Sequence, residues 1–421
     1  MGTLEDSKDT VILASASPRR RVLLEGAGLR IEVKPVDILE QPRSGEGPSE
    51  FALRMAQEKA EAARHPREPR PLLAGDTVVT IDGEILGKPR DVDHAIEMLT
   101  RLSGKAHKVI TGWALSHDGT ITADTTVSEV TFGALTQRQI EDYVATGEPM
   151  DKAGGYGIQG YGGALVDHYT GDFSNIVGFP LPDILRSLSL AGVGPQSALG
   201  RRYATLLGRT AAACAECDRS PEDVRIIGAS KAQSVESVQA GYAAGLRDFG
   251  ESYVQEFTAK RNVLPDDARW HFIGHLQRNK TRFIVPGIHQ IHTVSSIRLA
   301  ETIAKRARAN GITVPCLLQV NIGAEATKSG ATVDELPSLL EAVDGIDGVH
   351  ASGLMAIPPR GGLATSRQWF RRVRTLRDSL ATQERPLSEL SMGMSGDFDS
   401  AIIEGATQVR VGTALFGQRR P

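Results

Sequence analysis

The second half of the chain repeats one pattern, in which a short run of apolar, β-favouring residues is followed by a helix-like segment. The runs lie at 224–229, 247–250, 269–273, 290–294, 316–320, 349–355, 390–392 and 408–411. Strands that alternate with helices form right-handed crossovers and pair in parallel. Eight such strands in about 225 residues predict a closed TIM-type (β/α)8 barrel. The same alternation leaves an open, doubly wound parallel sheet as the alternative fold.

A linker precedes this half. The stretch SLAGVGPQSALGRR is rich in Gly, Pro and Ser, and a helix-like segment from Gln196 to Cys217 follows it. The first half mixes long strands with helices and predicts a mixed α/β domain. A length of 421 residues suits two domains, so we predict a first domain at 1–192 and a barrel domain at 193–421.

Charge and composition narrow the function classes. Lys and Arg number 48 against 51 Asp and Glu, which gives a net charge of −3 and no overall field for a nucleic-acid polymer or an acidic membrane. No apolar run approaches the roughly 20 residues that cross a bilayer, and the first residues do not have the pattern of a secretion signal. Only three cysteines occur, which fits a reducing compartment. We therefore expect a cytoplasmic protein that acts on small molecules.

A lysine follows the first strand of the predicted barrel directly. In RIIGASKAQS, Lys231 comes straight after an apolar run, so its amine is expected at the rim, where such barrels carry their chemistry. A lysine there can form a Schiff base with an aldehyde. The alternative is a solvated surface lysine.

The last two strands supply the groups that hold a phosphate. Strand seven begins SMGMSGDFDS, with hydroxyls at Ser391 and Ser395, and strand eight runs VRVGTALFG, with Gly412 and Thr413 at the start of a helix. Barrel closure places strand eight beside strand one and its lysine. A lysine beside a phosphate cup suits pyridoxal 5′-phosphate, with Arg410 able to donate to the ring nitrogen.

Several motifs of this half stand in the order of a known family. GASKAQSVESV, RDFGESYVQE, WHFIGHLQRNK, LLQVNIGAEATKSG, GLMAIPP and LSMGMSGDFDSAIIEGATQVRVGTALFG resemble the pyridoxal phosphate homeostasis proteins, the YggS-like family, from about Leu199 to Gly417. The resemblance implies a barrel that carries pyridoxal 5′-phosphate on Lys231 and acts in vitamin B6 homeostasis without a defined reaction of its own. It implies that Ser391, Gly412 and Thr413 hold the phosphate and that Arg410 faces the ring nitrogen. An amino-acid racemase of the related fold is the alternative.

The first half carries three polar clusters beside apolar runs. VILASASPRRRVLLEG places serines and arginines at a helix start, and AGDTVV places Asp76 after an apolar run. Lys88 lies about a dozen residues later, and GEPMDKAGGYGIQGYGG adds Lys152 and Gln159 in a Gly-rich segment. A carboxylate suits a divalent metal or an activated water, whereas the cations suit phosphates. Each residue taken alone is more often a cap or a turn.

These clusters together resemble the Maf family of nucleoside triphosphate pyrophosphatases. The family-like motifs over about Thr10 to Leu185 are ASASPRR, AQEKA, AGDTVV, GKPRD, LSGKAHKVITG, YVATGEPMDKAGGYGIQG and NIVGFPL. The resemblance implies hydrolysis between the α and β phosphates with a divalent cation, Mg²⁺ by expectation. It assigns catalysis to Asp76, Lys88, Lys59, Glu40 and Lys152, and the metal to Asp76 and Glu40.

Within that family, SPRR, DTVV and GYGIQG resemble the branch that acts on dTTP and UTP. By this resemblance Arg19, Thr77 and Gln159 mark substrate choice, and a homodimer forms through the first domain. Two alternatives stay open for this domain: hydrolysis of 7-methylguanosine triphosphate, and nucleotide binding without turnover.

Overall fold

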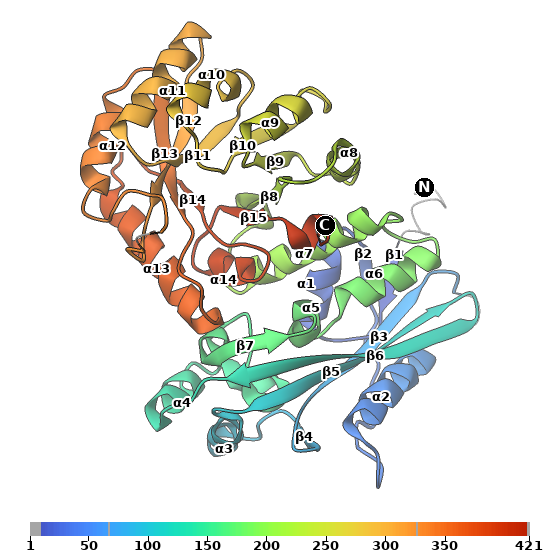
Figure 1. Cartoon of the computed structure of the whole chain (residues 1–421). Helices are drawn as coiled ribbons and strands as arrows, with labels where there is room; N and C mark the ends of the chain where they lie inside the picture. The colour runs from blue at the N-terminus through green and yellow to red at the C-terminus, as the bar shows by residue number, and fades with distance from the viewer. Residues whose placement is uncertain (1–9, 66–67, 326, 419–421) are drawn as a thin grey trace. The chain divides into compact units, whose positions relative to one another are not determined.

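The computed structural model describes residues 10–65, 68–325 and 327–418 (Figure 1). Contacts between residues divide the chain into two compact units. The N-terminal unit comprises residues 1–219 together with 362–364, and the second unit comprises 220–361 and 365–421. In the described ranges, no helix is long and apolar enough to span a membrane.

A mixed sheet forms the frame of the N-terminal unit. Its strands follow the order β2-β1-β3-β5-β6-β7, with β4 paired to β3. β1 pairs in parallel with β2 and β3, whereas β3, β5, β6 and β7 pair antiparallel. The bounds are β1 Thr10–Leu13, β2 Arg30–Val33, β3 Leu72–Ile81, β4 Glu84–Leu86, β5 Ala106–His117, β6 Thr120–Phe132 and β7 Val166–Thr170.

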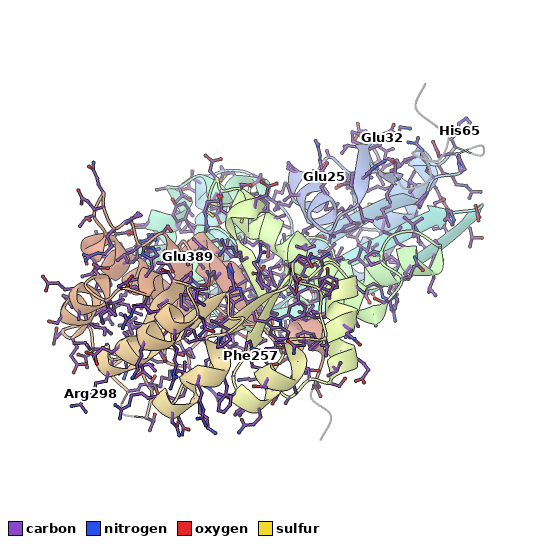
Figure 2. The ribbon with its side chains drawn as sticks, turned by 90° about the horizontal axis from the view of Figure 1, so that it is seen from above. Glu25, Glu32, His65, Phe257, Arg298 and Glu389 are labelled. Carbon is purple, nitrogen blue, oxygen red and sulfur yellow. The ribbon has the colours of Figure 1, made fainter. Side chains whose placement is uncertain are left out.

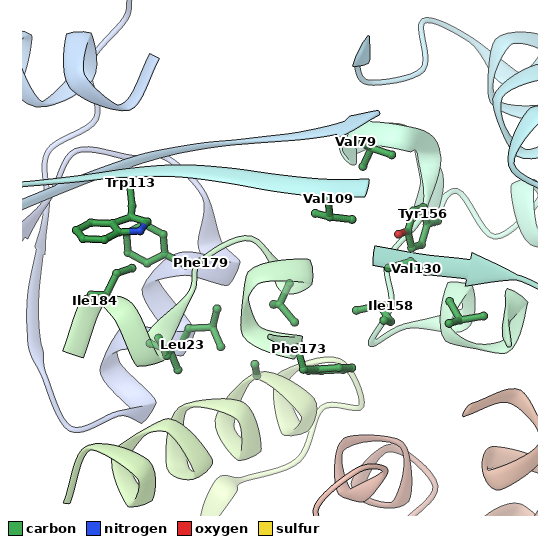
Figure 3. Close-up of a cluster of buried hydrophobic side chains, with 14 of the residues drawn as sticks. Leu23, Val79, Val109, Trp113, Val130, Tyr156, Ile158, Phe173, Phe179 and Ile184 are labelled. Carbon is green, nitrogen blue, oxygen red and sulfur yellow. The ribbon is translucent and has the colours of Figure 1, made fainter. Parts of the chain in front are cut away.

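Helices cover both faces of this sheet because its strands alternate buried residues between the faces. The helices of the unit are α1 Pro18–Gly26, α2 Pro48–Ala63, α3 Val92–Leu102, α4 Gln137–Val144, α5 Phe173–Val177, α6 Leu181–Leu190 and α7 Ala198–Ala215, with short 3₁₀ helices η1 Glu148–Asp151, η2 Ala153–Gly155 and η3 Tyr161–Leu165. One face carries the large core cluster, part of which Figure 3 shows, including Leu23, Trp113 and Phe179.

Helix α2 covers the opposite face at close range. A Cβ atom at Gly112 of β5 would lie 2.1 Å from the carbonyl oxygen of Ala52 in α2, so only glycine permits this approach. Ala56 and Ala60 present small side chains to the same face of the sheet. The contact brings Lys59 of α2 over the middle of β3.

Helix α7 follows the linker and packs in the N-terminal unit. A Cβ at Gly208 of α7 would lie 2.5 Å from the carbonyl oxygen of Leu23 in α1, and one at Gly26 of α1 would lie 2.4 Å from the Cβ of Ala211. The predicted linker includes the residues between the end of α6 at Leu190 and the start of α7 at Ala198. The compact unit nevertheless continues past the predicted limit of residue 192 as far as Arg219.

The second unit is a closed barrel of eight parallel strands in the order β10-β11-β12-β13-β14-β15-β8-β9. The strands are β8 Arg225–Ala229, β9 Asp248–Glu251, β10 Arg269–Phe272, β11 Gln290–Val294, β12 Val314–Val320, β13 Val349–Ala356, β14 Glu389–Ser391 and β15 Gln408–Val411. The predicted TIM-type barrel is confirmed, and each predicted run overlaps a strand. The open-sheet alternative is wrong because β15 pairs with β8.

Helices follow each strand of the barrel. They are α8 Val235–Ala243, α9 Val254–Lys260, α10 Thr281–Ile284, α11 Ile297–Ala309, α12 Leu336–Asp344, α13 Leu363–Leu380, α14 Phe398–Ile403 and α15 Thr413–Phe416, with 3₁₀ turns η4 Pro221–Asp223 and η5 Arg278–Lys280. Phe257, labelled in Figure 2, is fully buried and lies edge-on to Trp270 with 6.0 Å between ring centroids. This aromatic contact anchors α9 to β10.

Candidate functional site

One cavity of about 790 Å³ opens in the N-terminal unit, among β3, the start of α1 and the Gly-rich 3₁₀ segments. Its lining includes all eight residues that the sequence predicts for catalysis and substrate choice in this half: Arg19, Glu40, Lys59, Asp76, Thr77, Lys88, Lys152 and Gln159. These residues come from six separate stretches of the sequence, so their convergence is a property of the fold.

A buried lysine joins two carboxylates at the floor of this cavity. The Lys59 Nζ lies 2.8 Å from the Asp76 Oδ1 and 2.6 Å from the Glu40 Oε1. The arrangement holds Asp76 in place while neutralising part of the negative charge. Among the described residues, no group of three or more His, Cys, Asp or Glu side chains forms a metal site. A cation here would therefore take its remaining ligands from phosphate oxygens and water.

Two cations that the sequence assigns to phosphates are held by a single acid. Asp151 accepts from the Arg19 Nη1 at 3.0 Å and from the Lys152 Nζ at 2.7 Å. Burial acts to raise the pKa of Asp151, but the hydrogen bonds from Lys152 and Arg19 outweigh it and lower that pKa. The acid thus holds both cations at the cavity. Lys88 lies exposed at the rim.

Arg20, next to Arg19, serves the framework of the site. Its guanidinium donates to the carbonyl oxygens of Gly178 at 2.9 Å and Gly75 at 2.7 Å, and to the hydroxyls of Ser15 and Thr77 at 3.0 Å each. Burial lowers the pKa of Arg20. The Thr77 hydroxyl also lies 2.9 Å from that of Thr111. Thr77 therefore lines the cavity with its hydroxyl already hydrogen-bonded.

Gln159 presents an unused donor to the cavity. Its side chain is 4% exposed, and its Nε2 atom has no hydrogen-bond partner among the described residues. A buried amide N–H without a partner is costly, so this group is stabilised when a ligand supplies an acceptor. A carbonyl oxygen on the edge of a base is an acceptor of this kind.

The cavity has two acidic lining residues that the sequence analysis does not single out, Asp151 and Glu216. Glu216 lies just after the end of α7 and lines the cavity together with Arg19 and Lys152. Burial raises the pKa of Glu216 above its usual value. No local motif marks this residue, because its place depends on the packing of α7 against α1.

At the carboxyl end of the barrel strands, Lys231 follows β8, and the Gly412–Thr413 turn follows the neighbouring strand β15. Gly412 occupies the N-cap of α15, and the backbone N–H of Ala414 donates to the Ser395 Oγ at 3.4 Å. Lys231, Thr413 and Ser395 thus all follow neighbouring strands, β8, β15 and β14, at the carboxyl end of the barrel. Both predicted groups of this rim, the lysine and the phosphate turn, lie on adjacent strands.

Ser391 has surroundings that differ from those expected for a phosphate ligand. It is the last residue of β14 and fully buried, and its hydroxyl accepts from the Arg410 Nη1 and lies 3.0 Å from the His292 Nδ1. The Arg410 Nη2 donates to the carbonyl oxygen of Ala356 at 3.0 Å. Burial lowers the pKa of Arg410 to about 10, which leaves it charged at neutral pH. Ser391 therefore contacts Arg410, whereas Ser395 contacts the Gly412–Thr413 turn through the backbone of Ala414.

Comparisons with known proteins match the two halves of the chain to two different families. A profile of Maf-like proteins matches residues 10–191, and a profile of the N-terminal domain of alanine racemase matches residues 216–420. The chain is 45% identical over 185 residues to the dTTP/UTP pyrophosphatase of Geobacter metallireducens, which spans 43% of this chain and 96% of that protein. It is 41% identical over 222 residues to the pyridoxal phosphate homeostasis protein of Aquifex aeolicus, spanning 52% of this chain and 97% of that protein.

The chain belongs to both families. Its first half belongs to the family of the Maf-like proteins, and its second half belongs to the family of the pyridoxal phosphate homeostasis proteins. Among solved structures, PipY of Synechococcus elongatus with pyridoxal phosphate bound is 36% identical to this chain, with a TM-score of 0.46, covering 52% of this chain and all of that one. Helix α7 lies between the two matched profiles.

Proposed function

We propose that the Maf-like half hydrolyses dTTP, UTP and related pyrimidine nucleoside triphosphates to the monophosphate and pyrophosphate. The observation that carries this proposal is the single cavity lined by all eight predicted residues. The relatives named as dTTP/UTP pyrophosphatases support the substrate class.

Asp76 is the proton acceptor in this proposal. A water oxygen attacks the α phosphorus, its proton passes to Asp76, and the bond from the α phosphorus to the bridging oxygen breaks, so that pyrophosphate leaves. Lys59 keeps the carboxylate oriented through its 2.8 Å contact. The residues fit a divalent cation, which we propose is Mg²⁺ held by Asp76 and Glu40. When bound, the cation offsets negative charge on the phosphates.

Three cations bind the phosphate chain. Lys88 is available at the rim, and Arg19 and Lys152 exchange Asp151 for phosphate oxygens when the substrate enters. Positioned positive charge stabilises the transition state of such transfers. Gln159 donates its unpaired N–H to a carbonyl of the pyrimidine, which favours this substrate class over 7-methylguanosine triphosphate.

The test is pyrophosphate release with Mg²⁺, comparing dTTP, UTP, 7-methylguanosine triphosphate and ATP on the full-length chain. We expect turnover of dTTP and UTP, and a loss of about 10³-fold or more in kcat for Asp76→Asn. Asp82→Asn, which changes an exposed turn residue after β3, is the matched control. Release from the methylated guanosine alone would reassign the substrate, and turnover that Asp76→Asn leaves intact would remove Asp76 from the mechanism.

We propose further that the barrel carries pyridoxal 5′-phosphate and acts in vitamin B6 homeostasis. The residues of this chain fit the group: an amine at Lys231, a cup formed by Gly412, Thr413 and Ser395, and a charged guanidinium at Arg410. The bound group supplies a reactive aldehyde. Arg410 donates to the ring nitrogen and, unlike a carboxylate, does not keep that nitrogen protonated, so the cofactor is a weak electron sink. This favours a carrier over a racemase.

Absorbance spectroscopy with added pyridoxal 5′-phosphate tests this assignment. We expect a band near about 420 nm that is lost in Lys231→Ala and kept in Lys328→Ala, which changes a lysine of the loop after β12. A band that survives in Lys231→Ala would show that another lysine holds the cofactor. Racemisation of alanine by the full-length chain would favour the racemase alternative.

The cysteines bear on the cellular location of the protein. The chain has only three cysteines, two of which are buried in the structure; this usage suits a reducing compartment, and we propose the cytoplasm. A homodimer through the N-terminal unit stays a prediction that light scattering of the purified protein can test.

A further inference from the structure

Five polar side chains form a continuous hydrogen-bonded chain through the interior of the barrel. They come from five strands: Asp248 of β9, His271 of β10, His292 of β11, Ser391 of β14 and Arg410 of β15. The Asp248 Oδ1 lies 2.9 Å from the His271 Nε2, the His271 Nδ1 lies 3.0 Å from the His292 Nε2, and the His292 Nδ1 lies 3.0 Å from the Ser391 Oγ. Arg410 completes the chain by donating to the Ser391 hydroxyl.

All five side chains are buried, and both histidine rings are fully inaccessible. Buried polar groups that water does not reach cost free energy unless they hydrogen-bond to one another. A series of five such groups in a barrel core therefore depends on every one of its hydrogen bonds. Apolar side chains would fill the same space without that requirement. This series of hydrogen bonds starts at Asp248, the first residue of β9, and ends at Arg410, one residue before the end of β15.

The anion at one end fixes the direction of the first bond. Asp248 also accepts from Arg269 at 2.8 Å and 2.6 Å, and the hydrogen bonds from His271 and Arg269 hold the pKa of its carboxyl well below the usual range despite burial. An ionised carboxylate only accepts, so the His271 Nε2 carries a proton and donates.

The next two bonds run through His292. Burial, with His271 beside it, lowers the pKa of His292 far below the usual range, so His292 is neutral and carries a proton on one ring nitrogen only. In the direction that starts from the carboxylate, the His271 Nδ1 accepts from the His292 Nε2–H, and the His292 Nδ1 accepts the Ser391 O–H. With its proton committed to His292, the Ser391 oxygen is left as an acceptor for the Arg410 N–H. Each donor and acceptor between Asp248 and Arg410 is used once.

We propose that His271 and His292 are positioning residues for Arg410, and that through Ser391 they aim its guanidinium at the ring nitrogen of the bound cofactor. The inference rests on the proposed function of the barrel as a pyridoxal phosphate carrier. It assigns a role to two buried histidines that neither the lysine nor the phosphate cup requires. Hydrogen bonds in such a series polarise one another, so the chain also strengthens the acceptor that Arg410 meets.

A first experiment uses the full-length chain without cofactor. Histidine-selective ¹⁵N NMR reports which ring nitrogen is protonated, and we expect the Nε2–H tautomer for both His271 and His292. His350, which is exposed on β13, gives the solvated reference. An Nδ1–H tautomer for either buried ring, or a charged His292, would overturn the proposed direction.

A second experiment measures binding of pyridoxal 5′-phosphate and of its carbocyclic analogue, which has C–H in place of the ring nitrogen. In His292→Gln we expect the Kd of pyridoxal 5′-phosphate to rise about tenfold, with the Kd of the analogue unchanged. His350→Gln is the control and should alter neither. An equal loss for both ligands in His292→Gln would mean that the histidine only supports the fold. His271→Asn repeats the comparison where His292→Gln does not fold.

Failure of this inference is distinguishable from failure of the proposed function. A wild-type chain that binds neither ligand contradicts the carrier role. A wild-type chain that binds both ligands equally well contradicts only the role of Arg410 and of the histidines behind it.

Discussion

Replacement of Arg20 by Met is expected to destabilise the N-terminal unit, although Arg20 lies in a run of three arginines that reads as a phosphate-binding cluster. The guanidinium makes four hydrogen bonds, two of them to the carbonyl oxygens of Gly75 and Gly178. A methionine fills the volume of the aliphatic part of the Arg20 side chain but leaves both carbonyl oxygens without this donor. Each loss costs about 1–3 kcal/mol, so the free energy of unfolding should fall by about 3–5 kcal/mol.

Differential scanning calorimetry of the full-length chain measures this loss. At about 2–4 °C per kcal/mol for a unit of this size, the Tm of the affected transition should fall by about 6–20 °C. Arg21→Met is the control, because Arg21 is exposed and contacts only Glu25 one turn along α1. Its expected loss is about 0.5 kcal/mol or less.

Arg19→Met completes the series. Arg19 pairs with Asp151 at the cavity, so its loss should raise KM for dTTP and leave Tm nearly unchanged. The reasoning is refuted if Arg20→Met melts within 2 °C of Arg21→Met, or if Arg19→Met is the variant that loses stability.

Three further predictions concern the same unit. Gln159→Leu should raise KM for dTTP about tenfold and alter kcat less, because the substitution removes the buried amide that donates to the base. Steady-state kinetics with dTTP and ATP check this. Equal losses for both nucleotides would contradict it. Glu216→Gln should lower KM about two- to threefold by removing negative charge from the cavity, with the difference shrinking in high salt; an unchanged KM at low salt would refute it. Burial lowers the pKa of His107 to about 4 from 6.5, so its neutral form contributes full stability above pH 6.5 and loses up to about 3 kcal/mol as the pH falls to 4. Urea unfolding across that range should show a shallower pH dependence in His107→Gln, and identical slopes would count against this assignment.

Much of the fold could be predicted because its signals are local. The eight strands of the barrel follow from apolar runs separated by helix-like sequence, and Pro18 marks the first residue of α1 as a proline at a helix start does. The convergence of Asp76, Lys88 and Lys152 on one cavity was predicted through the motifs they share with the Maf family, since their spacing along the chain carries no distance information.

The remaining features depend on tertiary contacts that no local pattern records. Arg19 and Arg20 are adjacent and chemically identical, yet a turn of about 100° along α1 sends one toward the cavity and the other under it. Ser391 and Ser395 flank the same short motif, but Ser391 belongs to β14 and points into the barrel, whereas Ser395 lies beyond the strand beside α15. The hydrogen-bonded chain from Asp248 to Arg410 joins side chains of five strands, so no short segment of the sequence contains it.

The packing of α7 has a consequence for any attempt to separate the two activities. The resemblance to the pyridoxal phosphate homeostasis proteins begins at about Leu199, inside a helix whose Gly208 contacts the backbone of Leu23 in the Maf-like half. A cut at residue 192 would remove α7 from its packing against α1, and it would also remove Glu216 from the cavity lining. The N-terminal product needs this helix, so a cut that separates the two compact units belongs after Arg219 and not at residue 192.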